Sequence, residues 1–440
     1  MLVVLFGMGI SERLRLACLF VQGFSFYKNK LTVTQKFQFE RHKNMRDVAI
    51  IGAGMIPFGQ REDGLMDMLA CASLHALDDA GLGDQSVDAV YVANVGGGML
   101  QHQTAIASSL ADRLNLLPAA AETIENGPAS GASAVKAGLL AIASGYYDTV
   151  LVVGGEKMRG TSARRVTDFV SAMTHPQAEY PYGVTMPGLG GMFARLYMEK
   201  YGLSPEHLQA VSIKNHEMGA LNPYAHFRKA INRADVFDGS QGIAKNPVVA
   251  DPLRLYDLCP TSDGAAALVL STVEIAKKMG RPYIVIAGFG QATDTHTLAE
   301  RADPTELKAV TLAAQKAFAM ANLKPSDIHV AELHDAFTIL EIAESERIGF
   351  FKEGEGGEAA ASGKTRLGGQ IPINVSGGLK ARGHPMGATG VAQVVDIVWQ
   401  LRHELPENRQ VKNAEIGLTI NFGGFANNVL CFILRRRKHE

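Results

Sequence analysis

The apolar residues of this chain fall into two kinds of run that alternate along the sequence. Short runs rich in Val and Ile, such as DVAIIGAG at residues 47–54 and TVLVVGG at 149–155, have the length and composition of buried strands. The runs between them are rich in Ala and Leu and are long enough for helices. Strands that alternate with helical segments are typical of an α/β fold, in which helices cover the sheets.

This pattern occurs twice. DVAIIGAG has a counterpart in YIVIAGFG at residues 283–290, and PASGASAVKAGLLAI, which starts at Pro128, aligns with HPMGATGVAQVVDIV, which starts at His384. The matched segments lie roughly 236 to 256 positions apart, which indicates a duplicated α/β unit. We expect Pro128 to be the first residue of its helix, a position that proline favours. Because helix N-termini carry free N–H groups and positive dipole ends, we expect the active site where the two helix starts converge.

Changes in composition predict the domain boundaries. Residues 1–44 have an apolar start and scattered Lys and Arg, and we expect them to be a leader outside the fold, either a transit peptide or the product of a translation start placed too far upstream. The N-terminal half is predicted to span residues 45–282 and the C-terminal half residues 283–440. Within the first half, the polar stretch at about 156–250 is interpreted as an inserted, irregular loop domain.

Composition and charge exclude several classes of protein. The formal net charge of -1 gives no electrostatic basis for binding nucleic acid or an anionic membrane, and no apolar stretch is long enough to span a bilayer. The sequence has four cysteines, which stand far apart without a CxxC pair: Cys18, Cys71, Cys259 and Cys431. Neither a disulfide framework nor a metal site is therefore predicted, and a reduced, cytoplasmic compartment is the default expectation. The string GAGMIPFG at 52–59 lacks the third glycine of a dinucleotide-binding loop, which argues against an oxidoreductase.

Four longer motifs carry a family resemblance. They are KNHEMGALNPYAHF at 214–227, CPTSDGAAALVL at 259–270, AELHDAFT at 331–338 and NVSGGLKARGHPMGATG at 374–390. In this form and order they resemble the thiolase family, and are most similar to its sterol-carrier-protein type and to archaeal acetoacetyl-CoA thiolases. The resemblance covers nearly everything after Met45. It implies a thiolase-like fold of two duplicated βαβαβαββ halves in a layered α/β arrangement, with an inserted loop domain.

The resemblance also implies the roles of two histidines. The family uses one cysteine as acyl-accepting nucleophile and a second as acid and base, supported by histidines of the HD-x-F and GHP motifs. His334 and His384 occupy those two histidine positions. The resemblance implies that His384 would activate the nucleophile and help to hold a thioester oxygen.

Both catalytic cysteines of the family are replaced in this chain. The nucleophile position, two residues before the Ser-Gly of PASG, is Pro128, which lacks a thiol and also lacks the backbone N–H that helps to form the family's oxyanion hole. The acid/base position is Ala336, and the C-terminal region that supplies this cysteine in other thiolases reads NFGG at 421–424. Ser130 is a nearby hydroxyl, but a serine there is more often a helix cap than a nucleophile.

Four further residues are predicted to bind the substrate. The resemblance implies that they contact an acyl-CoA thioester, with coenzyme A as part of the substrate and no separate cofactor or metal: Asn374, Gly377, Cys259 and Gly424. Cys259 is expected beside the pantetheine channel, more as an inert, partly buried thiol than as a reactive one.

Three functions remain open from the sequence. The first is an acyl-CoA acyltransferase-like enzyme that acts on C–C bonds without a cysteine acyl-enzyme. The second is a catalytically silent acyl-CoA-binding or scaffold subunit of a larger complex. The third is an aldol-lyase type of acyl-CoA enzyme; thiolase-like aldolases also lack the cysteine pair, but use tyrosines where this chain keeps histidines. The resemblance further implies a homodimer or homotetramer through the edge strand of the first-half sheet, and a possible small zinc-ribbon/OB-fold partner protein.

Overall fold

The computed structural model describes residues 45–82, 87–237 and 246–437. Its contacts divide the chain into two units, Met1–Arg46 and Asp47–Glu440, and the second unit holds the fold that follows. The predicted leader, residues 1–44, lies outside the described residues.

The first half contains an alternating series of strands and helices. In chain order these are β1 (Val48–Met55), α2 (Leu65–Ala80), β2 (Ala89–Ala93), α3 (Gly97–Leu100), α4 (Ile106–Arg113), β3 (Ala120–Ile124), α5 (Ser130–Ala143) and β4 (Thr149–Glu156), followed after a long insertion by β7 (Gly264–Thr272) and α11 (Val273–Met279). The strands are the Val- and Ala-rich runs of the sequence, and every residue of β1 and β7 is buried. Burial on both faces explains why these runs are continuously apolar.

The second half repeats the series. It comprises β8 (Ile284–Thr293), α12 (Lys308–Ala321), β9 (Val330–Glu332), α13 (Thr338–Ile348), α14 (Gly356–Ala361), α15 (Gly378–Arg382), α16 (Met386–Arg402), β10 (Ile416–Gly423) and β11 (Asn428–Arg436). The counterpart of β3 is reduced to a single bridge between Ala331 and Ile373. The duplication inferred from the sequence is thus present in the fold, with one strand nearly lost from the second copy.

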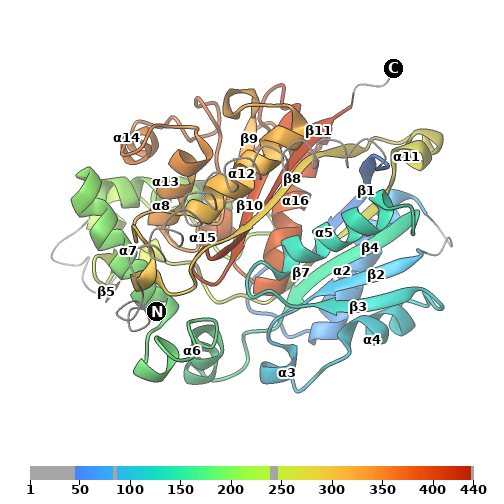
Figure 1. Cartoon of the computed structure of the whole chain (residues 1–440), viewed down its shortest axis with the longest axis horizontal. Coiled ribbons are helices and arrows are strands. Elements are labelled where there is room, and N and C mark those ends of the chain that lie inside the picture. The colour runs from blue at the N-terminus through green and yellow to red at the C-terminus, as the bar shows by residue number, and fades with distance from the viewer. Residues whose placement is uncertain (1–44, 83–86, 238–245, 438–440) are drawn as a thin grey trace, which may run out of the picture. The chain divides into compact units, whose positions relative to one another are not determined.

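All these strands form one nine-stranded sheet whose order shows the duplication. The order is β3-β2-β4-β7-β1-β8-β11-β10-β9, so each half has its parallel strands outside and its antiparallel strands inside (Figure 1). The halves meet where β1 pairs with β8 through Ala49 and Ile50 only. The fold is a layered α/β arrangement of two related halves, as predicted.

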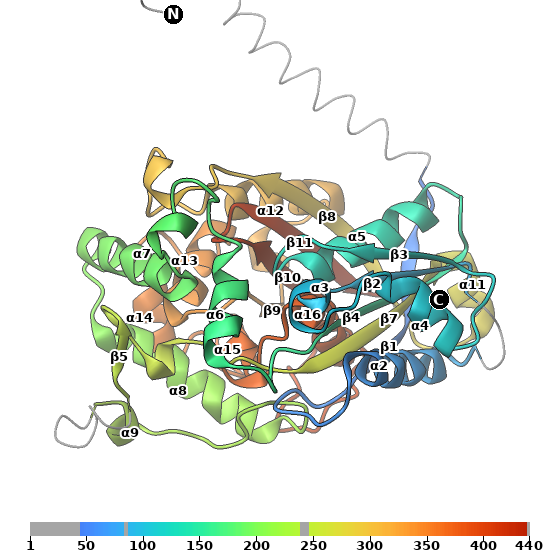
Figure 2. The ribbon, with the colours of Figure 1, turned by 90° about the horizontal axis from the view of Figure 1, so that it is seen from below.

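Two central helices pack against each other between the halves. α16 contacts α5 and also strands of both halves, while α2 covers β1 and β7 and α12 covers β8 and β11 (Figure 2). The crossing needs glycine, because a Cβ on Gly131 would lie 2.8 Å from the backbone nitrogen of Gly390. This close approach brings the N-terminal ends of α5 and α16 together.

The insertion between β4 and β7 is largely helical, where the sequence suggested irregular structure. It contains α6 (Ala163–Ser171), the 3₁₀ turn η3 (Tyr180–Tyr182), α7 (Met186–Tyr201), α8 (Pro205–Leu221), α9 (Arg233–Phe237), β5 (Val248–Ala250), β6 (Leu253–Arg254) and η4 (Leu255–Asp257). Leu189, Phe193 and Tyr197 of α7 join the hydrophobic core of the second half. Burial against that core stabilises helices that the polar composition did not suggest.

Candidate active site

A cavity of about 520 Å³ opens where α5 and α16 begin. Most of the residues singled out from the sequence line it: Pro128, Cys259, His334, Ala336, His384 and Gly424. Asn374 and Gly377 are not part of the lining. The expected convergence of the two helix starts is therefore present, and both histidines border the same space.

Pro128 borders the cavity from a turn, because α5 begins two residues later than expected, at Ser130. The hydroxyl of Ser130 accepts a hydrogen bond from the backbone N–H of Asn126 at 2.8 Å and donates one to the carbonyl of Gly127 at 2.6 Å. These bonds shape the turn that presents Pro128 to the cavity. Ser130 is fully buried and is not in the cavity lining, which leaves it a structural role.

His384 is held in one tautomer by Thr389, one turn into α16. Its Nδ1 lies 2.6 Å from the Thr389 hydroxyl, and that hydroxyl donates its proton to the carbonyl of Pro385 at 3.0 Å. The hydroxyl must therefore accept a hydrogen bond from His384 Nδ1–H, which leaves Nε2 with a free lone pair. Thr389 is not in the cavity lining, so this hydroxyl orients the imidazole and is not placed to attack a substrate.

His334 is held in the opposite tautomer. The side-chain amide nitrogen of Asn421 lies 2.9 Å from His334 Nδ1 and can only donate, so Nδ1 accepts and Nε2 carries the proton. The His334 ring is perpendicular to the His384 ring, with centroids 5.0 Å apart, and packs on Phe422. The cavity is thus bordered by one imidazole that accepts a proton and one that donates a hydrogen bond.

Both imidazoles are neutral at pH 7. Burial lowers the pKa of His384 to about 3, and the nearby positive charge of Arg382 contributes. The pKa of His334 is also lowered well below its usual value, first by burial and then by His384 and Arg382. A neutral His384 suits a general base, and His334 suits a donor to a developing oxyanion.

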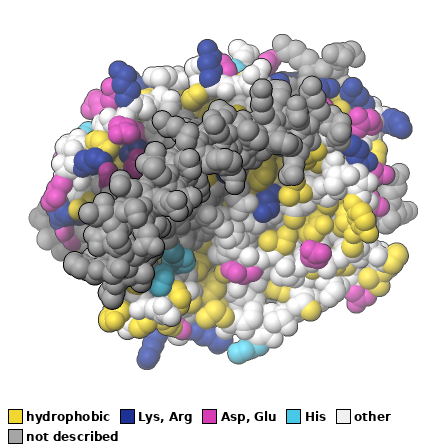
Figure 3. All heavy atoms as spheres, in the orientation of Figure 1, with side chains coloured by type: hydrophobic (Ala, Val, Ile, Leu, Met, Phe, Trp, Pro, Cys, Tyr) yellow, Lys and Arg dark blue, Asp and Glu magenta, His cyan; other side chains and the backbone are white. Residues whose placement is uncertain are grey.

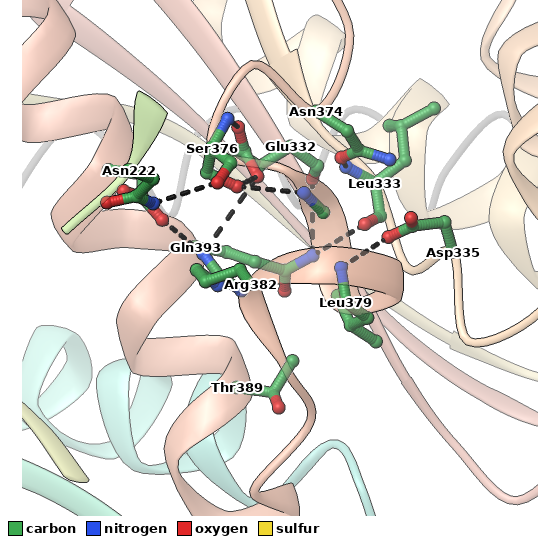
Figure 4. Close-up of polar contacts among 12 residues, drawn as sticks. Asn222, Glu332, Leu333, Asp335, Asn374, Ser376, Leu379, Arg382, Thr389 and Gln393 are labelled. Carbon is green, nitrogen blue, oxygen red and sulfur yellow. Dashed lines mark hydrogen bonds and ion pairs between the residues drawn. The ribbon is translucent and has the colours of Figure 1, made fainter. Parts of the chain in front are cut away.

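A buried polar network fixes the segments that carry the histidines (Figure 4). Arg382 forms an ion pair with Asp396 and lies 3.9 Å from Glu332, which in turn accepts hydrogen bonds from Ser376. The side-chain amide of Gln393 donates to the backbone carbonyl of residue 333 at 3.0 Å. These contacts tie α15 and α16 to the strand that ends just before His334.

Asn374 and Gly377 belong to this supporting structure. Asn374 is fully buried; its side chain accepts from the backbone N–H of Leu333 at 2.8 Å and donates to Glu341 at 2.7 Å. Gly377 has a φ of 100° at the start of α15, a conformation that favours glycine. The structure therefore places both residues where they hold the backbone, rather than at the substrate cavity.

Cys259 borders the cavity with a thiol that stays protonated. Burial raises its pKa to about 12, and the positive charge of Lys380 only partly opposes this. A protonated thiol is a weak nucleophile. Cys259 is therefore a weakly nucleophilic thiol at the cavity wall, and its place beside a pantetheine arm stays a prediction.

Two groups of residues shape this site without having been predicted from the sequence. Thr389 and Asn421 set the tautomers of His384 and His334. Both lie in segments that the sequence had singled out, Thr389 five positions after His384 and Asn421 three positions before Gly424. The second group forms the apolar walls, mostly from the insertion and its flanks: Met158, Val166, Val170, Met173, Met186, Leu258, Phe337, Leu340, Met386 and Phe425. The sequence pattern did not indicate these wall residues, because the polar composition of the insertion suggested irregular structure.

Among the described residues, no cluster of three or more His, Cys, Asp or Glu side chains is arranged to hold a metal ion. None of the helices described has the length and apolar character needed to cross a bilayer.

Comparison with known proteins finds relatives that match most of the chain. The chain is 42% identical over 393 residues to an acetyl-CoA acetyltransferase of Methanothermobacter thermautotrophicus, covering 89% of this chain and 100% of that protein. It is 33% identical over 396 residues to sterol carrier protein 2 of Oryctolagus cuniculus, covering 86% of this chain and 70% of the relative. Among solved structures, one titled "Ltp2-ChsH2(DUF35) aldolase" superposes with a TM-score of 0.74 at 25% identity, over 90% of this chain and 100% of that one.

The family models divide the chain as its duplication does. The one described as "Thiolase, N-terminal domain" matches residues 48–274, and the one described as "Thiolase C-terminal domain-like" matches residues 290–436. Together the two models span both halves of the sheet. Two of the relatives are named acetyl-CoA acetyltransferase, and this chain matches each of them over its whole length. The chain belongs to the thiolase family.

Proposed function

We propose that this chain makes or breaks a C–C bond next to the thioester of an acyl-CoA, through an enolate and without an acyl-enzyme. One observation carries the proposal. His384, with a free Nε2 lone pair, and His334, with an Nε2–H, border one cavity, and Pro128 stands there in place of a nucleophile. Such a site keeps a base and an oxyanion donor but lacks the family's acyl-carrying thiol at residue 128, while the thiol of Cys259 stays protonated.

The two histidines suffice for cleavage of a 3-hydroxyacyl-CoA. His384 Nε2 accepts the proton of the 3-hydroxyl group, the C2–C3 bond breaks, and C3 becomes a carbonyl. The bonding electrons pass to the thioester, giving an enolate whose oxygen accepts a hydrogen bond from His334 Nε2–H. The imidazolium of His384 returns its proton to C2, which gives a shorter acyl-CoA. Atoms and charge balance without a further reactant, and the reverse steps form the bond.

The size of the cavity favours this aldol type of reaction over direct acyl transfer. Without an acyl-enzyme, transfer between two coenzyme A thioesters needs both pantetheine arms in the site at once. One arm with a short acyl group has about 20 non-hydrogen atoms, and at about 30 Å³ each, the volume of a water molecule in the liquid, it takes roughly 600 Å³. A cavity of about 520 Å³ therefore suits one arm at a time. That one of the solved relatives is titled an aldolase agrees with this choice.

Two kinds of protein partner are proposed: a second copy of this chain, from its exposed surface, and a small partner protein, from one of its relatives. β3 is the edge strand of the first half, and three apolar side chains are exposed just before it and in or just after α5: Leu117 (59% exposed), Leu140 (45%) and Tyr146 (79%). Figure 3 shows hydrophobic side chains exposed on the side of the molecule where Figure 1 labels α5 and β3. Such a surface suits pairing with a second copy, in keeping with the expected homodimer or homotetramer. One solved relative is titled with a second component, ChsH2(DUF35), which supports a partner protein for this chain, while the small zinc-ribbon/OB-fold type stays a prediction.

The proposed reaction is tested with the purified chain and a panel of 3-hydroxyacyl-CoA and 3-ketoacyl-CoA thioesters, each with and without free coenzyme A. We expect 3-hydroxyacyl-CoA to give a carbonyl compound and a shorter acyl-CoA without added coenzyme A, and no acylated protein by intact mass. Turnover only of 3-ketoacyl-CoA, with strict dependence on coenzyme A and an acyl adduct, would overturn the proposal. Binding of acyl-CoA without any turnover, alone or with a partner, would identify the silent subunit instead.

The pH dependence of this turnover follows from the state of His384. Its pKa is lowered to about 3, so the base form is present above that value and is lost only as pH falls through it. We expect kcat/KM, which reports groups of the free enzyme, to lack an acid limb between about pH 5 and 8, where an ordinary histidine, with a pKa of about 6.5, would produce one. A bell-shaped profile with an acid limb near pH 6.5 would show that the base is a more exposed group.

A further inference from the structure

A separate hollow of about 330 Å³ lies at the far end of α16 from the active site. The polar side chains that border it come from the start of β8, the end of α16, the start of β10 and the end of β11: Tyr283, Arg402, Glu415, Arg436 and Arg437. α16 begins at the active-site cavity with Met386 and ends at this hollow with Arg402, about 24 Å further along the helix axis. A ligand in the hollow would therefore not compete with one in the active site.

Arg402 is buried with half of its hydrogen-bonding capacity unused. Its side chain is only 3% exposed, and its Nη1 lies 2.7 Å from the carboxylate of Asp79 and 3.8 Å from that of Glu404. Its Nε and Nη2 are also buried, and neither has a hydrogen-bond partner among the described residues. Buried donors on a charged group are costly to leave unpaired, so a ligand with acceptor oxygens in the hollow would relieve an existing deficit.

The other two arginines are exposed and only weakly engaged. The guanidinium of Arg436 has no ion-pair or hydrogen-bond partner in the part of the chain that the structure describes. Arg437 lies 3.7 Å from Asp47, whose side chain is 63% exposed. An ion pair of that length in water contributes little, so Arg437 loses little by turning to a ligand. Three guanidinium groups, one buried and two adjustable, can thus reach the same hollow.

The charge of the lining matches that of a phosphate group. Three arginines and one glutamate border the hollow, so the lining carries three positive charges and one negative charge, a formal total of +2. Asp47, Asp79 and Glu404 and the negative end of the α16 dipole reduce this charge, but the three carboxylates lie outside the lining and are each a third or more exposed, where water and salt screen them. A phosphate monoester carries about -1.5 to -2 at pH 7, whereas a single carboxylate carries -1.

We propose that this hollow binds a small phosphate monoester through the guanidinium groups of Arg402, Arg436 and Arg437. Guanidinium groups bind phosphate by paired, charge-assisted hydrogen bonds. At about 30 Å³ for each non-hydrogen atom, the volume of a water molecule in the liquid, 330 Å³ holds roughly 11 atoms. That is enough for a phosphate group with a short organic part and too little for a nucleotide. The site does not depend on the reaction proposed for the histidine cavity.

Calorimetric titration with glycerol 3-phosphate, and with acetate for comparison, tests the site. We expect the wild type to bind glycerol 3-phosphate and the double variant Arg436→Ala/Arg437→Ala to bind it at least tenfold more weakly. Arg113→Ala/Arg195→Ala is the matched control, because these two exposed arginines pair with Asp67 and Asp251 and do not border the hollow. It removes the same charge from the chain and should leave the affinity within twofold.

A variant of opposite sign guards against effects of misfolding. Glu415→Gln removes the one negative charge of the lining and should tighten binding of glycerol 3-phosphate at least twofold, a gain that a damaged fold would not give. Arg436 and Arg437 are exposed, so their replacement should leave the thermal melt within a few degrees of wild type. No binding to the wild type at millimolar concentration, equal binding to the Arg436→Ala/Arg437→Ala variant, or binding of acetate as tight as that of glycerol 3-phosphate would each overturn the assignment.

Discussion

Replacement of His384 by Ala should lower turnover of the preferred acyl-CoA by about 10³-fold, within the range usual for loss of a general base. The imidazole is the only group bordering the cavity for which the described contacts leave a basic nitrogen with a free lone pair. The affinity for coenzyme A should change little, because the variant removes the proton acceptor and leaves the other residues of the cavity lining in place. Steady-state kinetics and calorimetric binding on the same preparation measure the two effects.

Controls for this variant come from the same chain. Thr389→Val removes the acceptor that fixes His384 Nδ1–H and should lower kcat about tenfold or more, whereas Thr389→Ser keeps a hydroxyl and should restore most of it. His329→Ala removes an exposed histidine before β9 and should leave kcat unchanged. Full activity of the His384 variant would show that another group is the base, and the proposed mechanism would then be wrong.

The duplicated architecture could be predicted because its signal is local. Val- and Ile-rich runs must be strands when both faces are buried, and the match between the segments at Pro128 and His384 placed two helix starts in equivalent positions. What could not be predicted is the loss of one strand. The bridge at Ile373 follows a segment that forms α14 in place of an ordinary crossover, and no pattern in the sequence marks that exchange.

The site was predictable by residue type but not by chemical state. His334 and His384 stand in motifs, yet the motifs do not say which nitrogen of each ring carries the proton. Asn421, which the fold brings from a distant strand, decides this for His334. Thr389, which lies one helical turn away, decides it for His384. The same limit applies to Asn374. It stands in a recognised motif, but its side chain forms hydrogen bonds with the backbone of Leu333 and the carboxylate of Glu341 and does not line the cavity. A motif therefore locates the region of a site, while the hydrogen-bond partners decide which members face the substrate.

Replacement of Pro128 by Cys should convert the chain into one that forms an acyl-enzyme. The new thiol would border the cavity with His384, whose free Nε2 can accept its proton, and would stand just before the N-terminus of α5, where the helix dipole favours a thiolate. The change also restores a backbone N–H that proline lacks. With acetyl-CoA, the thiolate attacks the thioester carbon, the C–S bond breaks and free coenzyme A leaves. We expect close to one acetyl group per chain by intact mass, mapped to residue 128, against none for wild type.

Two further variants separate the causes of that gain. Pro128→Ala restores the N–H without a thiol and should give no adduct, whereas Pro128→Cys/His384→Ala keeps the thiol without its base and should acylate at least a hundredfold more slowly. An adduct mapped to Cys259 in the wild type would mean that the nucleophile is present after all, despite the raised pKa of that thiol. If the Pro128→Cys chain is folded, binds coenzyme A and still forms no adduct, residue 128 does not face the thioester, and the lack of an acyl-enzyme cannot be traced to its proline. A gain of acylation that depends on His384 would instead show that the residue at position 128 decides between covalent and non-covalent chemistry at this site.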